Sequence, residues 1–544
     1  MVHKKCRKDI KILFIIPRYA ITNKINYNYM FPIGLGYIYS TLKNNNYNIA
    51  CLNLNHCNGT ISDILKKEME KNYDIVCTGH IGSIGYLITK EIIDSIRKHR
   101  SKSKIILGGA LITSEPMLMF ESLKPDFGVI GEGEKTILEL LDSMQNKKNL
   151  RKVRGIIYKD NNKIIITEKR EPILDINSVP SPDFEDMGFE EYLNQLYPNQ
   201  DFCNNFFDYP RTYPILCSRS CPFQCTFCYH SIGNRYRERS VDDIIKELEA
   251  AVKKYNINTI AIYDDMLSYK KERLYELCKR IKELSKNIFQ DIKWTCQLSV
   301  VNIDEDLLKT LKDSGCELIS YGFESFSQEV LKSMKKPITP KQIDFAFKET
   351  LKAKISVQAN FIFGDVAETK ETARETLDYW KKNSNGQISL VFIQPYPCSE
   401  IYHHCIKKGI IKDRLEFIKN STGNLVLNMT DKMTDEEVNE LSNEIKKLEA
   451  TYKRFATPIK VKNMKGKRYE VHVDCPFCNQ RLIYKNYYLQ GRLLYRAYII
   501  CRKCNMRFYI SSPLIKLLKD YYFLTPYLED YARRIRKNFN LLRI

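Results

Sequence analysis

The sequence predicts an α/β protein with three or four domains. Near-continuous apolar strands alternate with amphipathic helical segments in two long series, and four cysteines in two close pairs mark a small β module near the C-terminus. A chain of 544 residues with 44% hydrophobic residues can bury several cores, which excludes a disordered or fibrous protein.

The first series predicts a domain over residues 1–150. Five apolar segments each precede a helix-compatible segment, which is typical of a parallel sheet covered by helices on both faces. The predicted strands are Lys11–Ile16, Asn48–Asn53, Asp74–Thr78, Lys104–Leu107 and Phe127–Ile130.

Glycines follow several of these strands. Gly79, Gly108, Gly109 and Gly131 stand at the predicted carboxyl ends, which is the edge where open α/β sheets bind ligands. Each glycine taken alone also fits a simple tight turn. Both interpretations stay open from the sequence.

Residues 151–205 are predicted to form a hairpin around Asp160 and a proline-rich connector. A second series of strands and helices runs from Tyr213 to Ile393 and repeats six times. It predicts a second α/β domain over residues 206–430.

A connecting helix is predicted within residues 431–457. Thr434 followed by Glu437 forms a capping box, which is a signal for the start of a helix. Residues 458–544 then form a last, basic module.

Three cysteines, Cys221, Cys225 and Cys228, follow the first strand of the second series. Three thiolates in one short loop can bind three irons of a [4Fe–4S] cluster and leave the fourth iron open for a substrate. The alternative is a zinc site, which would need a fourth ligand such as Cys217 or His230. We predict the cluster.

The C-x3-C-x2-C spacing, with Phe227 before its third cysteine, resembles the signature of the radical SAM enzymes. The resemblance extends over about residues 211–400 and implies a partial (βα)6 barrel. It implies that Phe227 packs against the adenine of S-adenosylmethionine. Further positions at the ends of later strands resemble cofactor contacts of the family: Asp264, Asp265, Gln297, Glu324 and Gly364.

The resemblance also implies the chemistry. Cys221, Cys225 and Cys228 would hold the catalytic cluster, and S-adenosylmethionine would bind its open iron and be cleaved to a 5′-deoxyadenosyl radical. A one-electron donor such as flavodoxin or ferredoxin would be a partner. The sequence departs from the family at Asp365-Val366, which replaces a proline-containing turn, and at Gln297, which replaces a common arginine.

The N-terminal domain resembles the cobalamin-binding subclass of this family. The matching segments are residues 31–37, Gly108-Gly109 and Gly131-Glu132-Gly133-Glu134. The resemblance implies a doubly wound, flavodoxin-like domain with cobalamin as a cofactor. The residues it places around the corrin ring are Gly34, Gly79, Gly108, Gly109, Gly131 and Glu132.

No histidine ligand to cobalt is expected. His56 and Gly59 have the spacing of the D-x-H-x-x-G motif, but Leu54 replaces its aspartate and the segment follows the second strand. We interpret His56 as a loop residue. His80, after the third predicted strand, is a candidate cobalamin contact, although a lone histidine is more often structural. Members of the subclass without the motif include both proteins that bind cobalamin and proteins that do not.

A second metal site is predicted in the C-terminal module. Cys475, Cys478, Cys501 and Cys504 form two C-x2-C pairs separated by 22 residues. Four thiolates at this spacing close a tetrahedral zinc ribbon. An auxiliary iron–sulfur cluster is the alternative, because four-thiolate sites hold either metal.

The net charge of +21 is concentrated at the C-terminus, where residues 451–544 hold 21 Lys or Arg against 5 Asp or Glu. Basic residues interleaved with tyrosines suit RNA or another anionic partner, and the alternative is a solvated face with buried tyrosines. The basic residues are Arg468, Lys485, Arg492, Arg496, Arg502, Lys503, Arg507, Arg533, Arg534, Arg536 and Lys537.

The cellular compartment expected for the protein follows from its apolar runs, its N-terminal segment and the spacing of its cysteines. No stretch approaches eighteen consecutive apolar residues, so we expect no membrane span, and the N-terminal segment carries no small-residue cleavage site. The 18 cysteines lack the spacing of a disulfide framework. We therefore expect a cytoplasmic protein.

The leading functional hypothesis is a radical SAM enzyme that acts as a cobalamin-dependent methyltransferase on an unactivated carbon. One alternative is a radical rearrangement, cyclisation or oxidation without methyl transfer. The other is RNA-directed modification through the basic zinc ribbon. No motif indicates the substrate.

Overall fold

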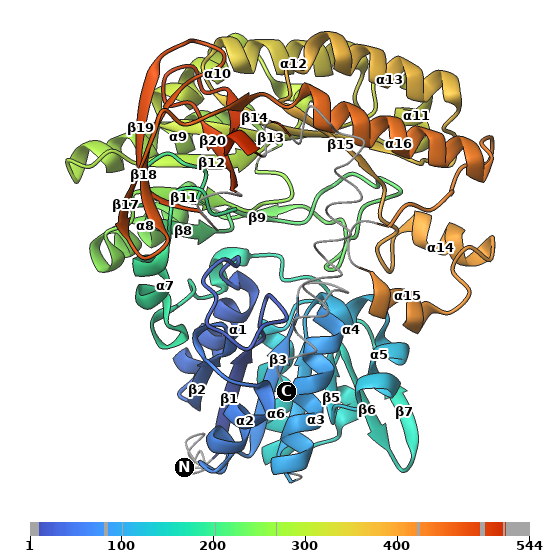
Figure 1. Ribbon diagram of the computed structural model, residues 1–544. Coiled ribbons are helices and arrows are strands. Elements are labelled where there is room, and N and C mark those ends of the chain that lie inside the picture. The colour runs from blue at the N-terminus through green and yellow to red at the C-terminus, as the bar shows by residue number, and fades with distance from the viewer. Residues whose placement is uncertain are drawn as a thin grey trace.

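The computed structural model describes residues 10–80, 85–100, 102–201, 203–267, 269–421, 425–489, 495–514 and 517. An N-terminal sheet domain lies below a larger domain built on a second sheet, and a C-terminal β module lies against the side of that larger domain (Figure 1). The predicted α/β architecture is therefore confirmed.

The N-terminal domain contains a seven-stranded sheet in the order β2-β1-β3-β4-β5-β6-β7. Its first five strands are parallel, and their order is that of flavodoxin-like domains. The first two strands have the predicted bounds, and the next three differ by one residue at one or both ends. The strands are β1 (Lys11–Ile16), β2 (Asn48–Asn53), β3 (Ile75–Gly79), β4 (Lys104–Gly108), β5 (Phe127–Val129), β6 (Ile156–Asp160) and β7 (Lys163–Ile166).

The β6–β7 hairpin, predicted in the connector, extends this sheet. Strand β6 pairs antiparallel with β5, which places Tyr158 opposite Phe127. Ile156 and Ile157 are fully buried. The hairpin therefore completes the core at one edge of the N-terminal sheet.

Helices cover both faces of the N-terminal sheet because its strands alternate their buried side chains. Phe14 packs with α1 and α6 on one face, and Leu13 packs with α2, α3 and α5 on the other. The helices are α1 (Ile33–Asn44), α2 (Ile61–Met69), α3 (Tyr86–His99), α4 (Ala110–Ser114), α5 (Pro116–Leu123) and α6 (Glu134–Gln145).

The second domain is a partial barrel of six parallel strands in the order β15-β14-β13-β12-β11-β8. The strands are β8 (Thr212–Ile215), β11 (Thr259–Ile262), β12 (Lys293–Gln297), β13 (Cys316–Glu324), β14 (Ser356–Phe363) and β15 (Ile388–Phe392). Two short paired strands, β9 (Ser218–Arg219) and β10 (Arg237–Glu238), follow β8.

The barrel helices begin at capping residues that the sequence indicates. The Ser240 side chain accepts from the Asp243 backbone at the start of α8, and Thr339 with Gln342 forms a complete capping box at α12. The helices are α8 (Val241–Tyr255), α9 (Lys271–Asn287), α10 (Glu305–Asp313), α11 (Gln328–Ser333), α12 (Pro340–Lys352) and α13 (Lys370–Asn383).

The connector joins the two domains through one aromatic cluster. Phe31 of the N-terminal domain contacts Phe184 and Phe189, and both of these contact Tyr213 of the barrel. Phe189 begins the connector helix α7 (Phe189–Gln195). These rings are buried, so the two domains share a continuous core.

The segment after the barrel returns to the N-terminal domain. Helices α14 (Glu400–Lys407) and α15 (Arg414–Asn420) lie between the two domains in Figure 1, and Ile418 is buried among the residues that pack on the N-terminal sheet. The predicted connecting helix is α16 (Asp435–Tyr452), and Thr434 and Glu437 form its capping box.

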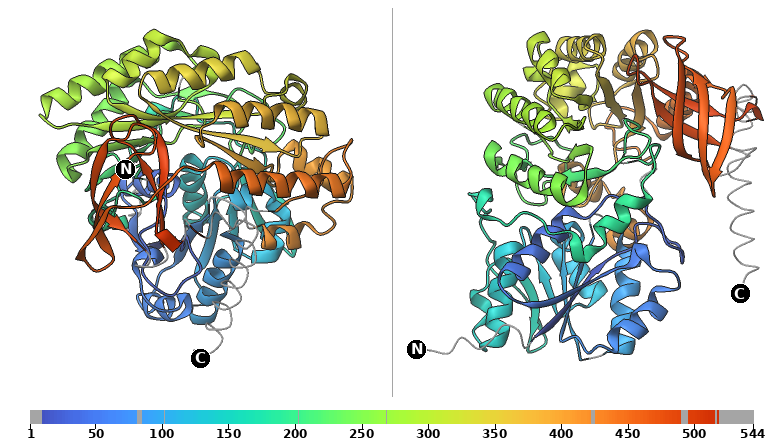
Figure 2. Two further views of the ribbon diagram at one scale, coloured as in Figure 1. Left: turned by 45° about the horizontal axis from the view of Figure 1, so that its top comes forward. Right: turned by 90° about the vertical axis from the view of Figure 1, so that its left-hand side faces the viewer.

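The C-terminal module lies outside the barrel in both views of Figure 2. It contains two three-stranded sheets, ordered β17-β18-β19 and β16-β21-β20. The strands are β16 (Phe455–Ala456), β17 (Lys460–Lys465), β18 (Arg468–Asp474), β19 (Arg481–Tyr488), β20 (Arg496–Ile500) and β21 (Arg507–Ser511).

Candidate functional site

The three cysteines of the first cluster lie in a loop between β9 and β10, here called the cysteine loop (residues 220–236). Cys225 is buried, and Cys221 and Cys228 are partly buried. The Cys225 and Cys228 thiols share a hydrogen bond, which lowers the pKa of Cys225 and raises that of Cys228, and the positive charge of Lys336 acts to lower the pKa of all three thiols. Because the thiolate is the metal-binding form, these surroundings suit an iron cluster.

Lys336 was not indicated by the sequence. Its Nζ lies 2.9 Å from Oε1 of Glu324, the residue that ends β13 and has a φ of 61°. A Cβ at Gly322 would lie 2.2 Å from that carboxylate oxygen and 2.7 Å from the lysine nitrogen. The absence of a side chain at Gly322 leaves room for this ion pair, which brings a predicted cofactor residue close to the cysteine loop.

Asp264 is buried at the end of β11. Its carboxylate accepts from the Cys217 backbone N–H at 2.7 Å, and its second oxygen lies 2.7 Å from Oγ of Ser218. Burial raises the pKa of Asp264 from 3.8 to about 7. Both carboxylate oxygens are thus used to join β11 to the segment that leads into the cysteine loop.

Asp265 and Gln297 lie side by side on neighbouring strand ends. Nε2 of Gln297 donates to the Asp265 backbone carbonyl at 3.1 Å, and both side chains are exposed. Asp265 is therefore exposed, although partial burial of its carboxylate raises its pKa above the ordinary value, whereas Asp264 is enclosed.

Gly364 has a φ of 96°, in the left-handed region, and its N–H donates to the Glu368 carboxylate. Burial raises the pKa of Glu368 to about 8. Oε1 of Glu368 is buried and has no hydrogen-bond partner among the described residues. The turn after β14 therefore encloses a carboxyl group with one free oxygen.

Phe227 is partly buried and packs against an apolar cluster that includes Met334, Ile393 and Ile401. This cluster joins α11, the end of β15 and α14. The apolar wall beside the cysteine loop thus comes from three separate parts of the barrel.

The carboxyl edge of the N-terminal sheet combines two kinds of glycine. At Gly34, Gly108 and Gly131 an added Cβ would meet no described atom within 4 Å. At Gly79 it would lie 2.7 Å from the Gly108 carbonyl, and at Gly109 it would lie 2.8 Å from the His80 carbonyl. The first three leave open space, and the last two allow close backbone packing. The open space suits a broad ligand lying against this edge.

Neither of the two histidines that the sequence singles out in the N-terminal domain, His56 and His80, is a free loop residue. Nε2 of His56 lies 2.9 Å from the Tyr29 hydroxyl, and its Nδ1 lies 3.3 Å from the Glu191 carboxylate of the connector. His80 packs where a Cβ on Gly85 would lie, 2.0 Å from its ring. The interpretation of His56 as a plain loop residue is therefore refined, because it belongs to a buried polar contact with α7.

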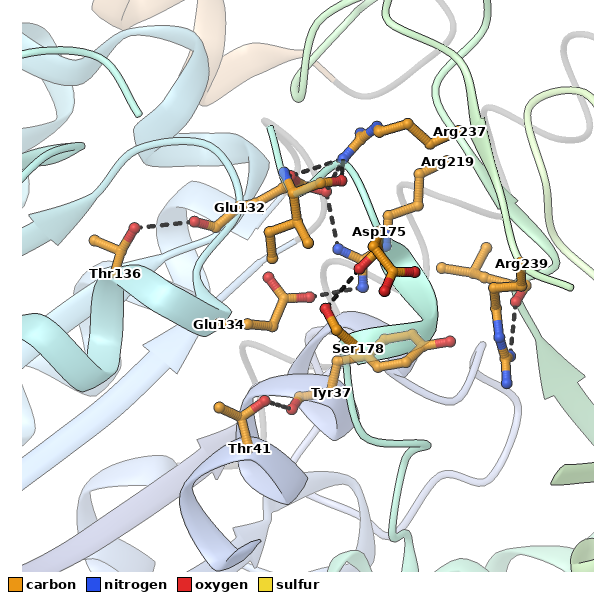
Figure 3. Close-up of polar contacts among 12 residues, drawn as sticks. Tyr37, Thr41, Glu132, Glu134, Thr136, Asp175, Ser178, Arg219, Arg237 and Arg239 are labelled. Carbon is orange, nitrogen blue, oxygen red and sulfur yellow. Dashed lines mark hydrogen bonds and ion pairs between the residues drawn. The ribbon is translucent and has the colours of Figure 1, made fainter. Parts of the chain in front are cut away.

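Glu132 lies at the boundary between the two α/β domains (Figure 3). It follows the open glycine Gly131 in the sequence, but its side chain contacts residues of the barrel domain. Its carboxylate accepts from Arg219 at 2.9 Å, from Arg237 at 2.8 Å and from the Ile173 backbone N–H at 2.7 Å. Arg219 also donates to Glu134 at 2.7 Å. Burial alone would raise the pKa of Glu132, but the two guanidinium groups hold it below its ordinary value. Neither arginine was indicated by the sequence.

The cysteine loop reaches the carboxyl edge of the N-terminal sheet. The hydroxyl of Tyr229, the residue after Cys228, donates to the Ala110 carbonyl at 2.9 Å. Ala110 directly follows Gly108 and Gly109. The cysteine loop and the glycine edge, predicted in separate domains, are therefore adjacent.

The second cysteine group converges on one point. The ligand atoms of Cys475, Cys478, Cys501 and Cys504 all lie within 4.8 Å of one another, and the Cys475–Cys504 and Cys478–Cys501 Sγ pairs are each 3.8 Å apart. Zinc–sulfur bonds of about 2.3 Å in a tetrahedron place the sulfurs about 3.8 Å apart. The group therefore fits a single metal ion.

Several basic residues of the C-terminal module make contacts within the chain. Arg468 donates to the Leu196 carbonyl at 3.2 Å, Arg502 donates to Asp208 at 2.8 Å, and Arg507 donates to the Gln387 carbonyl. Arg496 lies over the ring of Tyr509. Arg492 and residues 533–537 lie outside the described residues.

These contacts attach the module at the amino ends of the barrel strands. Asp208 precedes β8, Gln387 precedes β15, and Asn505 donates to Glu317 near the start of β13. The cysteine loop follows the carboxyl end of β8. The two cysteine groups therefore lie at opposite ends of the barrel.

Across the residues that the structure describes, no helix is long and apolar enough to cross a lipid bilayer.

Two family models match the chain in its two α/β domains. Residues 215–379 match the Radical SAM superfamily, and residues 23–141 match the B12 binding domain. The matches coincide with the barrel that carries the cysteine loop and with the sheet that carries the open glycine edge.

Two curated relatives are named as methyltransferases, and one solved structure has a similar fold. An uncharacterized methyltransferase of Pyrococcus horikoshii is 28% identical over 74% of this chain and 85% of its own length. Cytidylyl-2-hydroxyethylphosphonate methyltransferase of Streptomyces wedmorensis is 23% identical over 80% of this chain and 89% of its own. The fold is similar to that of the radical S-adenosylmethionine methyltransferase TsrM of Kitasatospora setae, solved with cobalamin and a [4Fe-4S] cluster, with a TM-score of 0.58 at 16% identity over 73% of this chain and 75% of that one.

Proposed function

Because the chain joins a radical SAM domain to a B12-binding domain, we propose that it is a cobalamin-dependent methyltransferase that acts on an unactivated carbon. The observation that carries the proposal is the hydrogen bond from Tyr229 to Ala110, which joins the cysteine loop to the open glycine edge. A cofactor held by the cysteine loop and a second one held at the open glycine edge would both be adjacent to a single substrate. The two relatives named as methyltransferases support methyl transfer as the reaction class.

Cys221, Cys225 and Cys228 would hold a [4Fe–4S] cluster, and the open space at Gly34, Gly108 and Gly131 would receive cobalamin. When bound, the cluster with S-adenosylmethionine would supply a 5′-deoxyadenosyl radical, and cobalamin would supply the methyl group. Phe227 and its apolar neighbours exclude water from the region where a radical must be protected.

The S-adenosylmethionine contacts are proposed at Phe227, Asp265, Gln297, Glu324 and Gly364. Of the two aspartates that follow β11, the exposed Asp265 is the better candidate because Asp264 uses both carboxylate oxygens inside the fold. Glu132 is placed better as an interdomain residue than as a corrin contact, because its carboxylate is already engaged by two arginines.

We also propose zinc for the C-terminal cysteine group. The four thiolates of a [4Fe–4S] cluster each bind a different iron, and those of a [2Fe–2S] cluster are divided between two irons, so the sulfurs stand farther apart than around a single ion. The four sulfurs here converge on one point instead. The contacts at the amino ends of the barrel strands support a structural role for this module.

The partners proposed are a one-electron donor, such as flavodoxin or ferredoxin, and a substrate that the structure does not name. The RNA alternative has less support, since Arg468, Arg502 and Arg507 are used within the chain. A reducing cytoplasm suits the thiolate ligands of both metal sites.

The test uses the full chain, reconstituted without oxygen with iron, sulfide and hydroxocobalamin, then reduced and given S-adenosylmethionine with an isotopically labelled methyl group. We expect two products: 5′-deoxyadenosine, and cobalamin that carries the labelled methyl group on its cobalt. 5′-Deoxyadenosine without labelled corrin would favour rearrangement, cyclisation or oxidation. Neither product, with the cluster intact, would overturn the proposal.

A further inference from the structure

Four charged side chains form a buried cluster between the two α/β domains, here called the interdomain ion-pair cluster (Glu132, Glu134, Arg219 and Arg237). Their side chains are only 4–9% exposed. Charges buried to this degree are stable only when they are paired and hydrogen-bonded, so the positions of the partners are strictly defined. Figure 3 shows the two carboxylates and the guanidinium groups directed toward each other.

The two arginines stand on either side of the cysteine loop. Arg219 lies on β9 and Arg237 on β10, and the two residues are opposite each other in this antiparallel pair. The chain between them carries Cys221, Cys225 and Cys228. Any contact made by these arginines therefore fixes the base of the loop from both ends.

The two glutamates belong to the N-terminal domain. They follow β5 at its carboxyl edge, and Glu134 begins α6. Gly131 has a φ of 80°, and a Cβ on Gly133 would lie 2.8 Å from Ile38 of α1. Both glycines thus permit the backbone course that directs Glu132 and Glu134 toward the barrel.

The cluster includes further contacts from both domains and the connector. The Arg219 guanidinium lies 4.9 Å from the ring centre of Tyr37 in α1. Arg237 also donates to the Ile173 carbonyl at 2.8 Å, while the Ile173 N–H donates to Glu132 at 2.7 Å. Three segments of the chain are therefore fixed together at the base of the cysteine loop.

We propose that Glu132 and Glu134 are positioning residues that hold the cysteine loop at a fixed distance from the carboxyl edge of the N-terminal sheet. The proposal rests on the proposed function, in which that edge holds cobalamin and the loop holds the iron–sulfur cluster. Apolar packing would tolerate sliding of one domain on the other, whereas hydrogen bonds between buried carboxylates and guanidinium groups are directional and fix one arrangement.

The test compares Glu132→Gln and Glu134→Gln with Glu139→Gln as the matched control. Glu139 lies on α6, the helix that begins at Glu134, and it pairs with Arg170 of the connector. Its side chain is 49% exposed. The first measurement is amide hydrogen exchange of the full chain after cluster reconstitution, in peptides that cover residues 218–220 and 237–239.

We expect exchange in both peptides to rise by about tenfold or more in the Glu132 and Glu134 variants, with iron content unchanged, and to stay at the native rate in the control. The second measurement uses cobalamin-loaded protein, in which a reduced cluster speeds the electron-spin relaxation of cob(II)alamin. This effect falls steeply with the distance between the cluster and the cobalt. We therefore expect a smaller effect in the Glu132 and Glu134 variants than in the native protein. A purely structural loss of stability would leave that relaxation unchanged in the folded molecules.

Native exchange rates in the two peptides of the Glu134 variant would overturn the proposal. That variant loses only the contact with Arg219, so it decides the question if the Glu132 variant does not fold. If the protein retains no corrin, the proposed function fails, while the exchange measurement still decides whether the two glutamates hold the loop.

Discussion

Arg237 donates from one guanidinium nitrogen to both carboxylate oxygens of Glu132, at 2.8 Å each, across 105 positions of the chain. The contact joins β10, the short strand that follows the cysteine loop, to the carboxyl edge of the N-terminal sheet. Two sites that the sequence placed in separate domains are therefore parts of one region, and the predictions below concern its parts.

Cys225→Ala should abolish 5′-deoxyadenosine formation and lower the iron content of the reconstituted protein. Cys225 is a buried thiol of the cysteine loop, and the positive charge of Lys336 favours its thiolate, the form that binds iron. Cys217→Ala is the control, because Cys217 is fully buried and its backbone, not its sulfur, contacts Asp264. Iron analysis and product chromatography check both variants, and loss of iron from the Cys217 variant would instead make that residue a ligand.

Asp264→Asn should flatten the dependence of stability on pH. Ser218 Oγ lies 2.7 Å from both Asp264 and the Met266 carbonyl, and its single proton can serve only one of them. When Asp264 is protonated, its carboxyl group donates to the Ser218 hydroxyl, and the Ser218 hydroxyl donates to the Met266 carbonyl. All three polar groups then have a hydrogen bond. Burial raises the pKa of Asp264 from 3.8 to about 7, so its contribution to stability is complete below pH 3.8 and is lost as the pH rises to about 7.

Within this window the loss is about 1.4 kcal/mol per pH unit, because only the unfolded state has released the proton. Asparagine keeps the donor and the acceptor without titrating, whereas Asp264→Ala removes both. Thermal unfolding between pH 5 and 8 checks the prediction. A slope in the asparagine variant equal to that of the native protein would place the titration on another group.

Gly108→Ala should weaken cobalamin retention without lowering the unfolding temperature. Its Cβ would meet no described atom within 4 Å, so the folded chain accommodates it, but it enters the space proposed for the corrin. Gly79→Ala should behave oppositely, because its Cβ would lie 2.7 Å from the Gly108 carbonyl and must disturb the sheet. Corrin absorbance after desalting and thermal unfolding separate the two effects, and unchanged retention in the Gly108 variant would exclude corrin from this space.

Cys501→Ser should remove one zinc per chain and destabilise the C-terminal module while the catalytic iron stays. The four sulfurs converge on one ion, and a structural zinc site contributes directly to folding energy. Elemental analysis for zinc, iron and sulfide checks the assignment. Loss of about four irons per chain, with no zinc in the native protein, would identify an auxiliary cluster instead.

The sequence predicts local features well. Strands β1 and β2, the Thr434 capping box and the two C-x2-C pairs of the C-terminal module depend on spacing within a few residues, and all are present in the structure. Contacts between distant segments could not be predicted, because no pattern links Arg219 to Glu132 or Arg468 to Leu196. Charged residues that looked like a solvated or RNA-binding face are therefore partly internal, and Glu132 pairs with the barrel.

The central claim is that one chain holds an iron–sulfur cluster and cobalamin together. The most direct measurement is the ultraviolet–visible spectrum of the protein after anaerobic reconstitution with iron, sulfide and hydroxocobalamin and removal of unbound cofactor. We expect corrin bands at about one per chain together with the broad iron–sulfur absorption. A spectrum with iron–sulfur absorption and no corrin would contradict the claim.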